Sequence, residues 1–221
     1  MSDQIFITQD GSHSIFSKQF GVSYHSKYGA IQETQHVFIE AGLRYKALLQ
    51  REITVLDIGF GTGLNAYMTL LEGINRGLQL TYIAYEAYPV SVEQAQTLNY
   101  AQLMDIPNTS SFSQLHTSPW NQPVSIHKDF TITKKLASFQ SINASNEFDV
   151  IYFDAFAPSA QPELWETSLL TKMYTALKSG GILVTYCAKG QVKRNLKAVG
   201  FEIEKLKGPP GKREMTRALK V

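Results

Sequence analysis

One stretch near residue 60 constrains the fold more than any other part of the chain. An apolar run at residues 53–56 leads through Asp57 into three alternating glycines, Gly59, Gly61 and Gly63. This pattern predicts a buried parallel strand, a tight turn and a helix N-terminus. Glycine permits the sharp turn and lets a bound molecule approach the backbone without an intervening Cβ. We therefore expect an α/β fold whose ligand lies over this turn.

The spacing of the glycines indicates the kind of ligand. Dinucleotide-binding turns read G-x-G-x-x-G, whereas this turn reads G-x-G-x-G and has Leu64 at the place of the third dinucleotide glycine. Asp57, two positions before the first glycine, would repel a pyrophosphate but suits a cationic cofactor. The stretch resembles the first motif of class I S-adenosylmethionine (SAM) methyltransferases. By itself the motif leaves an ordinary glycine-rich strand–helix turn open.

The rest of the chain alternates between strand-like and helix-like segments. Strands are expected near 53–57, 80–86, 123–128, 148–154, 181–187, 201–206 and 215–220, and helices near 64–75, 90–99, 164–178 and 189–199. Such alternation predicts a sheet covered on both faces, with ligands at the carboxyl ends of its strands. The last two strands flank residues 208–211, Gly-Pro-Pro-Gly, and should pair antiparallel. A seven-stranded, mostly parallel sheet with an antiparallel C-terminal edge pair is the Rossmann-like class I methyltransferase architecture.

The N-terminal 50 residues read as a cap on this sheet. Two apolar segments flank the turn dipeptide Asp10-Gly11 and predict a hairpin, and residues 30–41 predict a helix. We expect residues 1–50 to pack on a methyltransferase domain that spans 51–221, in a single structural unit. The polar interval 100–122 is expected to cover part of the site.

Composition excludes several classes of protein. With 43% hydrophobic residues the chain can bury a full core, and no apolar run approaches the roughly 20 residues that span a bilayer. The N-terminus lacks the features of a signal peptide, and the single cysteine, Cys187, excludes an internal disulfide. A soluble, cytoplasmic protein is therefore expected. Cys187 reads as a buried small residue, and the five histidines show no metal-ligand spacing, so no metal is expected.

Charge is distributed unevenly along the chain. Residues 189–221 hold 10 lysines and arginines against 3 acidic residues, whereas residues 1–188 hold 11 against 16. A basic end suggests a polyanionic partner, although a solvated lysine-rich surface explains the same run.

Three acidic residues follow expected strands. Glu86 lies 23 positions past Gly63, where a carboxylate can accept both hydroxyls of a ribose. Asp129 follows the strand expected at 123–128 and is assigned to an adenine amino group, with Phe130 beside the base. Asp154 ends the strand expected at 148–154, where chemistry is expected. For Glu86 and Asp154, a role as a capping or surface acid is the alternative.

The loop after this strand makes the resemblance specific. Residues 153–165, Phe-Asp-Ala-Phe-Ala-Pro-Ser-Ala-Gln-Pro-Glu-Leu-Trp, resemble the signature of the methyltransferase part of the bacterial tRNA 5-methylaminomethyl-2-thiouridine biosynthesis protein family. Further segments are similar in order, namely 33–34, 37–38, 59–65, 85–89, 192–194 and 207–215. The resemblance spans nearly the whole chain, with a weak match over 100–147.

The resemblance implies a reaction. In that family SAM methylates the primary amine of a 5-aminomethyl-(2-thio)uridine at the wobble position of tRNA, giving 5-methylaminomethyl-(2-thio)uridine. The known protein has a second, FAD-dependent oxidase domain without a counterpart here. We therefore expect a stand-alone enzyme whose aminomethyl substrate a separate enzyme supplies. A transferase acting on a small-molecule amine, or a non-catalytic tRNA-binding protein on the same fold, are the alternatives.

The resemblance and the motifs together assign site residues. Asp154 is expected to orient the amine and Phe156 to lie beside it. The residues expected to bind the cofactor are Asp57, Gly59, Phe60, Gly61, Thr62, Gly63, Asn65, Glu86, Ala87, Asp129, Phe130 and Asp154. Those expected to contact the base or the RNA are Tyr24, Glu33, Pro158, Trp165, Lys193, Arg194, Lys207, Lys212 and Arg213. For the aromatic residues, packing in the core is the alternative.

Overall fold

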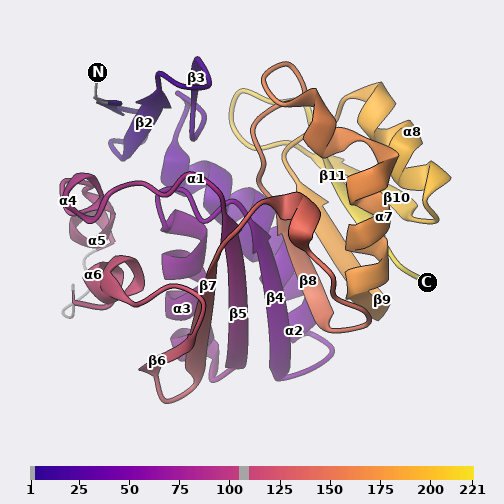
Figure 1. Cartoon of the computed structure of the whole chain (residues 1–221), viewed down its shortest axis with the longest axis horizontal. Coiled ribbons are helices and arrows are strands. Elements are labelled where there is room, and N and C mark those ends of the chain that lie inside the picture. Colours follow the sequence, from indigo (N-terminus) through magenta and orange to yellow (C-terminus); the bar gives the residue numbers. More distant parts are fainter. Residues whose placement is uncertain (1–2, 105–109) are drawn as a thin grey trace.

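A computed structural model describes residues 3–104 and 110–221. Its centre is an eight-stranded sheet in the order β10-β11-β9-β8-β4-β5-β7-β6 (Figure 1). The strands are β4 (Glu52–Ile58), β5 (Gln79–Glu86), β6 (Pro123–His127), β7 (Phe130–Leu136), β8 (Phe148–Phe153), β9 (Leu177–Thr185), β10 (Glu202–Lys207) and β11 (Glu214–Leu219). Strands β7, β5, β4, β8 and β9 run parallel, and β11 and β10 complete one edge antiparallel. The expected fold class is confirmed.

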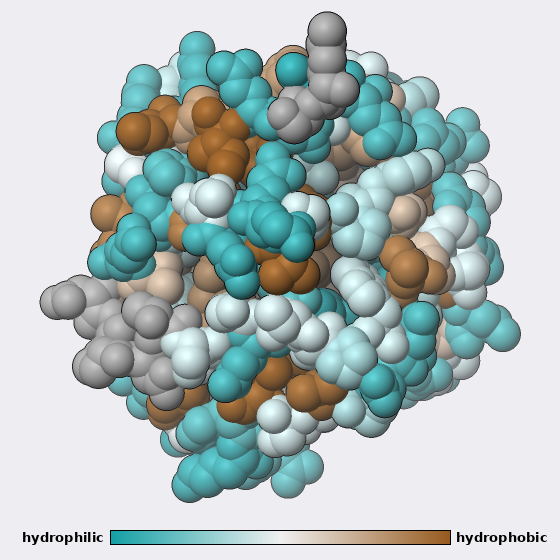
Figure 2. All heavy atoms as spheres, turned by 60° about the vertical axis from the view of Figure 1, so that its left-hand side comes forward, coloured by the Kyte–Doolittle hydropathy of each residue, from teal (hydrophilic) through white to brown (hydrophobic). Residues whose placement is uncertain are grey.

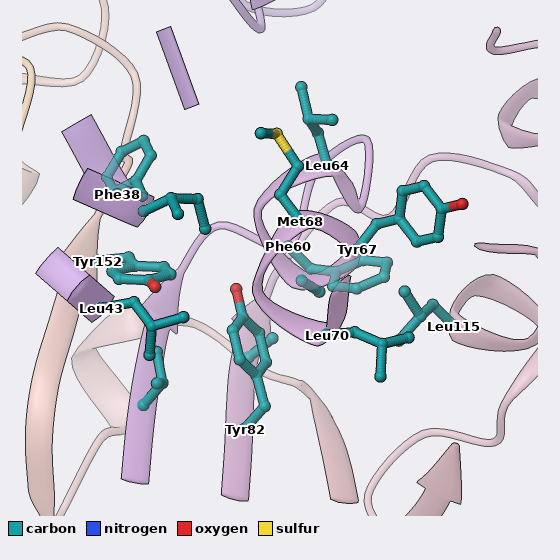
Figure 3. Close-up of a cluster of buried hydrophobic side chains, with 14 of the residues drawn as sticks. Phe38, Leu43, Phe60, Leu64, Tyr67, Met68, Leu70, Tyr82, Leu115 and Tyr152 are labelled. Atoms are coloured by element: carbon teal, nitrogen blue, oxygen red, sulfur yellow. The ribbon is translucent and has the colours of Figure 1, made fainter. Parts of the chain in front are cut away.

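Helices cover both faces of the sheet because its central strands are apolar on both faces. Along β4, Val55 packs in the cluster on one face and Leu56 in the cluster on the other. The first face is covered by α3 (Leu64–Arg76) and by α6 (Ser110–Thr117), and the second by α7 (Thr167–Ala176) and α8 (Gly190–Ala198). Figure 3 shows Tyr152 of β8 beside Phe38 and Leu43, with Tyr82 of β5 between this group and the side chains of α3.

The N-terminal residues form a separate three-stranded sheet and a helix. Strands β1 (Gln4–Ile7), β2 (His13–Ser17) and β3 (Val22–Ser23) pair antiparallel in this order. The helix comprises α1 (Ala30–Thr34), the π-helical turns of η1 (Gln35–Arg44) and α2 (Tyr45–Ala47). It packs against β8 and β9, where a Cβ on Gly42 would lie 3.1 Å from Tyr152 and from Val184. The division into a cap and a main domain stays a prediction.

One edge of the sheet differs from the expectation. The strand expected at 123–128 exists as β6, but it pairs antiparallel with β7, and β7 is the strand that lies beside β5. The described residues therefore form eight strands in this sheet and not seven. The helix expected at 90–99 is only α4 (Val92–Ala95), followed by α5 (Tyr100–Leu103).

The surface is mixed. On the face in Figure 2, hydrophobic side chains form separate patches among hydrophilic ones. None of the helices within residues 3–104 and 110–221 is long and apolar enough to cross a membrane.

Candidate functional site

A pocket lies at the carboxyl ends of β4, β5 and β8. Ile58 is the register partner of both Tyr85 and Phe153, so the residues that follow these three strands come side by side. The pocket holds about 930 Å³ of empty space, part of it open to solvent. Its lining residues are Phe20, Tyr24, His25, Gly59, Phe60, Gly61, Thr62, Leu64, Asn65, Glu86, Ala87, Tyr88, Ser138, Phe139, Gln140, Asp154, Ala155, Phe156, Gln161, Glu163 and Leu164.

The glycine turn forms one wall of the pocket. Gly59, Gly61 and Gly63 have φ angles of 101°, 49° and 74°, which L-residues rarely adopt. A Cβ on Gly61 would meet the ring of Tyr24 at 3.0 Å. The turn is fixed to β5 because the Gly59 N–H donates to the carbonyl of Tyr85 at 3.0 Å. The strand–turn–helix expectation is met. Gly59, Phe60, Gly61 and Thr62 line the pocket, whereas Gly63 lies against His116, outside the pocket lining.

Glu86 faces this wall. Its Oε2 accepts from the Gly61 N–H at 2.9 Å and its Oε1 from the Tyr88 N–H at 2.8 Å. The residue is buried, and burial raises the pKa of its carboxyl. A carboxylate oxygen has two lone pairs, so each oxygen can still accept a hydroxyl of a ligand.

Asp57 does not line the pocket, so the structure does not support its assignment as a cofactor contact. The residue is fully buried beneath the turn, where the Tyr82 hydroxyl donates to Oδ2 at 2.6 Å. Its Oδ1 has no hydrogen-bond partner among the described residues, and burial raises the pKa of the carboxyl to about 8. The alternation along β4 turns this side chain to the face of α3.

Asp154 closes the opposite side of the pocket. The Nδ2 of Asn65 donates to its Oδ2 at 2.8 Å. Burial raises the pKa of Asp154 well above the usual range of an aspartate. Two side-chain hydrogen bonds fix the backbone of the loop that follows. The Tyr186 hydroxyl donates to the carbonyl of Ala155, and the Trp165 N–H donates to that of Phe156, each at 2.8 Å.

Two histidines contact the glycine turn at Thr62. The His25 Nε2 lies 2.8 Å from the hydroxyl of Thr62, and the His116 Nε2 lies 3.0 Å from its carbonyl oxygen. Burial lowers the pKa of both imidazoles to about 4, so both are neutral near neutral pH. They act as hydrogen-bonding groups and not as cations.

Aromatic rings gather at one side of the pocket. The ring of Phe156 lies 5.1 Å from those of Tyr24 and Phe20, and Phe20 lies 5.2 Å from Tyr88. Tyr24 and Phe156 are partly exposed and line the pocket, as a base-contacting role requires. Trp165 is different, because it is 2% exposed and packs on Phe153 in the core. Its expected stacking on a base is wrong, and core packing is what the structure gives.

The assignment of Asp129 and Phe130 to adenine is also wrong. Phe130 is the register partner of Leu80 near the start of β5, and Gln79 donates to the Asp129 carboxylate at 2.6 Å. Both residues therefore lie at the amino edge of the sheet, opposite the pocket. The reason is the β6–β7 hairpin, which reverses the chain at Asp129. The carboxyl end of β7 instead leads to Ser138, which lines the pocket.

The basic residues divide into paired and exposed ones. Lys193 pairs with Glu214 at 2.7 Å, and Lys212 pairs with the buried Glu33 at 2.6 Å. Contact with RNA phosphates is therefore not the role that the structure supports for these two lysines. Glu33 also accepts a hydrogen bond from the Ser26 N–H and does not line the pocket. Arg194, Lys207 and Arg213 are exposed, and their assignment stays a prediction. Pro158 lies half-buried in the loop after Asp154, outside the pocket lining.

Several lining residues were not foreseen from the sequence, namely Phe20, His25, Ser138, Phe139, Gln140, Gln161, Glu163 and Leu164. The alternating pattern of residues 130–136 could have located β7, and with it residues 138–140. The described residues contain no group of three or more side chains suited to a metal ion.

Known proteins resemble this chain. A model of the S-adenosyl-L-methionine-dependent methyltransferase family matches residues 120–221. The tRNA 5-methylaminomethyl-2-thiouridine biosynthesis bifunctional protein of Actinobacillus pleuropneumoniae is 28% identical over 90% of the chain, and that of Marinomonas sp. is 31% identical over 90%. The chain spans about a third of the length of these relatives. The crystal structure of MNMC2 from Aquifex aeolicus has a TM-score of 0.81 at 23% identity, over all of this chain and 70% of that one.

These similarities confirm the resemblance and the fold expected from the sequence, and the family whose model matches residues 120–221 is one that uses S-adenosyl-L-methionine. The residues that line the pocket also fit S-adenosylmethionine. Gly59 and Gly61 leave space at the pocket wall that a Cβ would occupy. The Glu86 carboxylate, an acceptor suited to ribose hydroxyls, bonds to this turn through the Gly61 N–H. The space between them continues to Asp154.

Proposed function

We propose that this chain, whose relatives are named for tRNA 5-methylaminomethyl-2-thiouridine biosynthesis, is a SAM-dependent N-methyltransferase acting on a wobble-position 5-aminomethyl-(2-thio)uridine in tRNA. The product would be 5-methylaminomethyl-(2-thio)uridine. The observation that carries the proposal is the meeting of the glycine turn, Glu86 and Asp154 in one pocket. It supports a site in which a nucleoside cofactor and an amine lie next to each other.

The chain's own residues divide the work of binding. Glu86 would hold the cofactor through ribose hydroxyls, and the backbone of Gly59 and Gly61 would allow its close approach. Tyr24 and Phe156 would contact the uridine, which must leave its base stack to enter a pocket.

The chemistry requires a neutral, aligned amine. The cofactor supplies a methyl group on a sulfonium, so the nitrogen lone pair forms the new bond as the electrons of the carbon–sulfur bond return to sulfur. The protein's part is alignment, and the ring of Phe156 helps to desolvate the amine, which lowers an ammonium pKa. Asp154 accepts a hydrogen bond from the amine and takes up its developing positive charge. The proton of the product ammonium leaves to solvent.

A labelled methyl-transfer assay tests this function. Two tRNA pools, one carrying 5-aminomethyl-uridine and one lacking it, are incubated with methyl-labelled SAM, and the nucleosides are identified by mass spectrometry. Label on the aminomethyl nucleoside alone is expected. Label on neither pool, but on free small amines, would overturn the tRNA assignment and favour a small-molecule transferase.

The proposal has two consequences for the cell. A reaction that only adds a methyl group needs an amine that is already present, so we propose that a separate enzyme supplies the aminomethyl group. A tRNA substrate also implies a cytoplasmic location.

A further inference from the structure

A buried chain of hydrogen bonds connects the N-terminal helix to Asp154. The Thr34 hydroxyl donates to Oδ1 of Asn65 at 3.0 Å, and Nδ2 of Asn65 donates to Oδ2 of Asp154 at 2.8 Å. Thr34 is fully buried and Asn65 is 4% exposed. The three residues lie in α1, in the first turn of α3 and directly after β8, so only the folded chain brings them together.

The direction of these bonds fixes the amide of Asn65. A carboxamide has one accepting and one donating end, and the donating end must face the carboxylate of Asp154. The Thr34 hydroxyl stabilises this orientation because it donates to the accepting end. A flipped amide would place an oxygen against Oδ2 of Asp154, with two acceptors facing each other.

This arrangement leaves the other carboxylate oxygen for a ligand. Among the described residues, no protein group donates to Oδ1 of Asp154, and the residue lines the pocket. Asn65 lines it as well. The amide thus sets the orientation of the carboxylate plane, and with it the direction of the free oxygen.

We propose that Thr34 and Asn65 are positioning residues that hold Asp154 as an oriented acceptor for the substrate amine. The inference rests on the proposed function and deepens it, because it makes the N-terminal helix part of the catalytic arrangement. Thr34 does not line the pocket and acts through Asn65.

Several charges face Asp154 from the elements packed around it. Glu33 of α1 and Asp57 of β4 disfavour its carboxylate, while Lys212 of the loop between β10 and β11 favours it. The hydroxyls of Tyr82 on β5 and Tyr186 after β9 feel its charge in turn. The Asn65 hydrogen bond also favours the carboxylate. Loosening this bond should therefore raise the pKa of Asp154 further.

The test compares Thr34→Val, which keeps the size and removes the donor, with Thr34→Ser, which keeps the donor. Thr69→Val is the matched control, because Thr69 is a buried threonine of α3 whose hydroxyl lies 3.2 Å from that of Tyr152. For each variant kcat, the KM of SAM and the pH profile between about pH 6 and about pH 9 are measured on aminomethyl-tRNA.

The expected result is specific to orientation. In Thr34→Val, kcat falls about tenfold with the KM of SAM within about twofold, and the alkaline rise of kcat moves to higher pH. Thr34→Ser restores both, and Thr69→Val leaves both unchanged. The melting temperature of each variant separates these effects from loss of fold.

Two outcomes would overturn the inference while the proposed function stands. One is a wild-type kcat and pH profile in Thr34→Val. The other is a Thr34→Ser variant as impaired as Thr34→Val, which would mean that a hydroxyl donor at this position does not restore function and that side-chain packing decides. A wild-type protein without activity on aminomethyl-tRNA would instead overturn the proposed function, and the inference with it.

Discussion

The Oε2 atom of Glu86 accepts a hydrogen bond from the backbone N–H of Gly61 at 2.9 Å. This bond joins the glycine turn after β4 to the acidic end of β5, the two segments that the sequence first singled out. The Tyr88 N–H fixes the second oxygen at 2.8 Å. The carboxylate is thereby oriented by backbone groups before any ligand arrives, which lowers the ordering cost of binding.

We predict that Glu86→Gln weakens SAM binding at least about tenfold, a change of about 1.4 kcal/mol. A carboxamide offers only one accepting atom to the Gly61 and Tyr88 N–H groups and to the ribose hydroxyls together. Isothermal titration calorimetry measures the affinity, with Glu93→Gln as a control at an exposed site nearby. An unchanged Kd in Glu86→Gln would remove Glu86 from the cofactor site.

Asp154→Asn should lose turnover and keep the cofactor. We expect kcat to fall about 100-fold or more, because an amide cannot take up the charge that develops on the amine. The Kd of SAM should stay within about threefold, since Glu86 and the glycine turn remain. In the wild type, where burial raises the pKa of Asp154, kcat should rise with pH as the carboxylate forms. Near-normal turnover in the variant would contradict the role.

Asp57 should make the folded protein less stable at higher pH. Burial raises its pKa to about 8, against about 3.9 in an unfolded chain, so the folded state holds one more proton between these values. The free energy of unfolding therefore falls as pH rises through this range. Urea unfolding measures the free energy of unfolding at about pH 5 and about pH 8. Its fall between these pH values should be smaller in Asp57→Asn than in the wild type, by about 1 kcal/mol or more. Asp129→Asn, at the amino ends of the strands, is the control. An equal fall of the free energy of unfolding in the wild type, Asp57→Asn and Asp129→Asn would refute the prediction.

The exposed and paired basic residues should behave differently toward tRNA. Arg213→Gln and Lys207→Gln should each lower the slope of log affinity against log salt concentration by about one. Lys193→Gln should instead lower the melting temperature by breaking the pair with Glu214, with little change of slope. Filter binding over a salt series measures the slope. A fall of the slope by about one in Lys193→Gln would reverse the assignment.

Trp165 should contribute to stability rather than to RNA affinity. Trp165→Phe removes the N–H that donates to the carbonyl of Phe156, at a cost of about 1 kcal/mol in the free energy of unfolding. The Kd for tRNA should remain within about twofold. Weaker tRNA binding at unchanged stability would instead restore the stacking role expected from the sequence.

The positions of the glycine turn, Glu86 and Asp154 at strand ends could be predicted from local sequence patterns. Gly59, Gly61 and Gly63 adopt positive φ angles, which glycine allows without steric cost. Glu86 ends β5 and Asp154 directly follows β8, and both strands can be recognised from their apolar residues. These features follow from short-range sterics and from the periodicity of neighbouring residues. The Rossmann-like fold follows from the same alternation.

Which elements pack against one another could not be predicted from local patterns. Residues 123–127 have the pattern of a strand, but their antiparallel pairing with β7, and hence the place of Asp129 far from the pocket, depends on a neighbouring strand. The inward position of Trp165 and the ion pair of Lys193 with Glu214 depend likewise on partners distant in the sequence. So does the bridge from Thr34 to Asp154. Burial and pairing are set by non-local packing, which a local pattern of residue types does not encode.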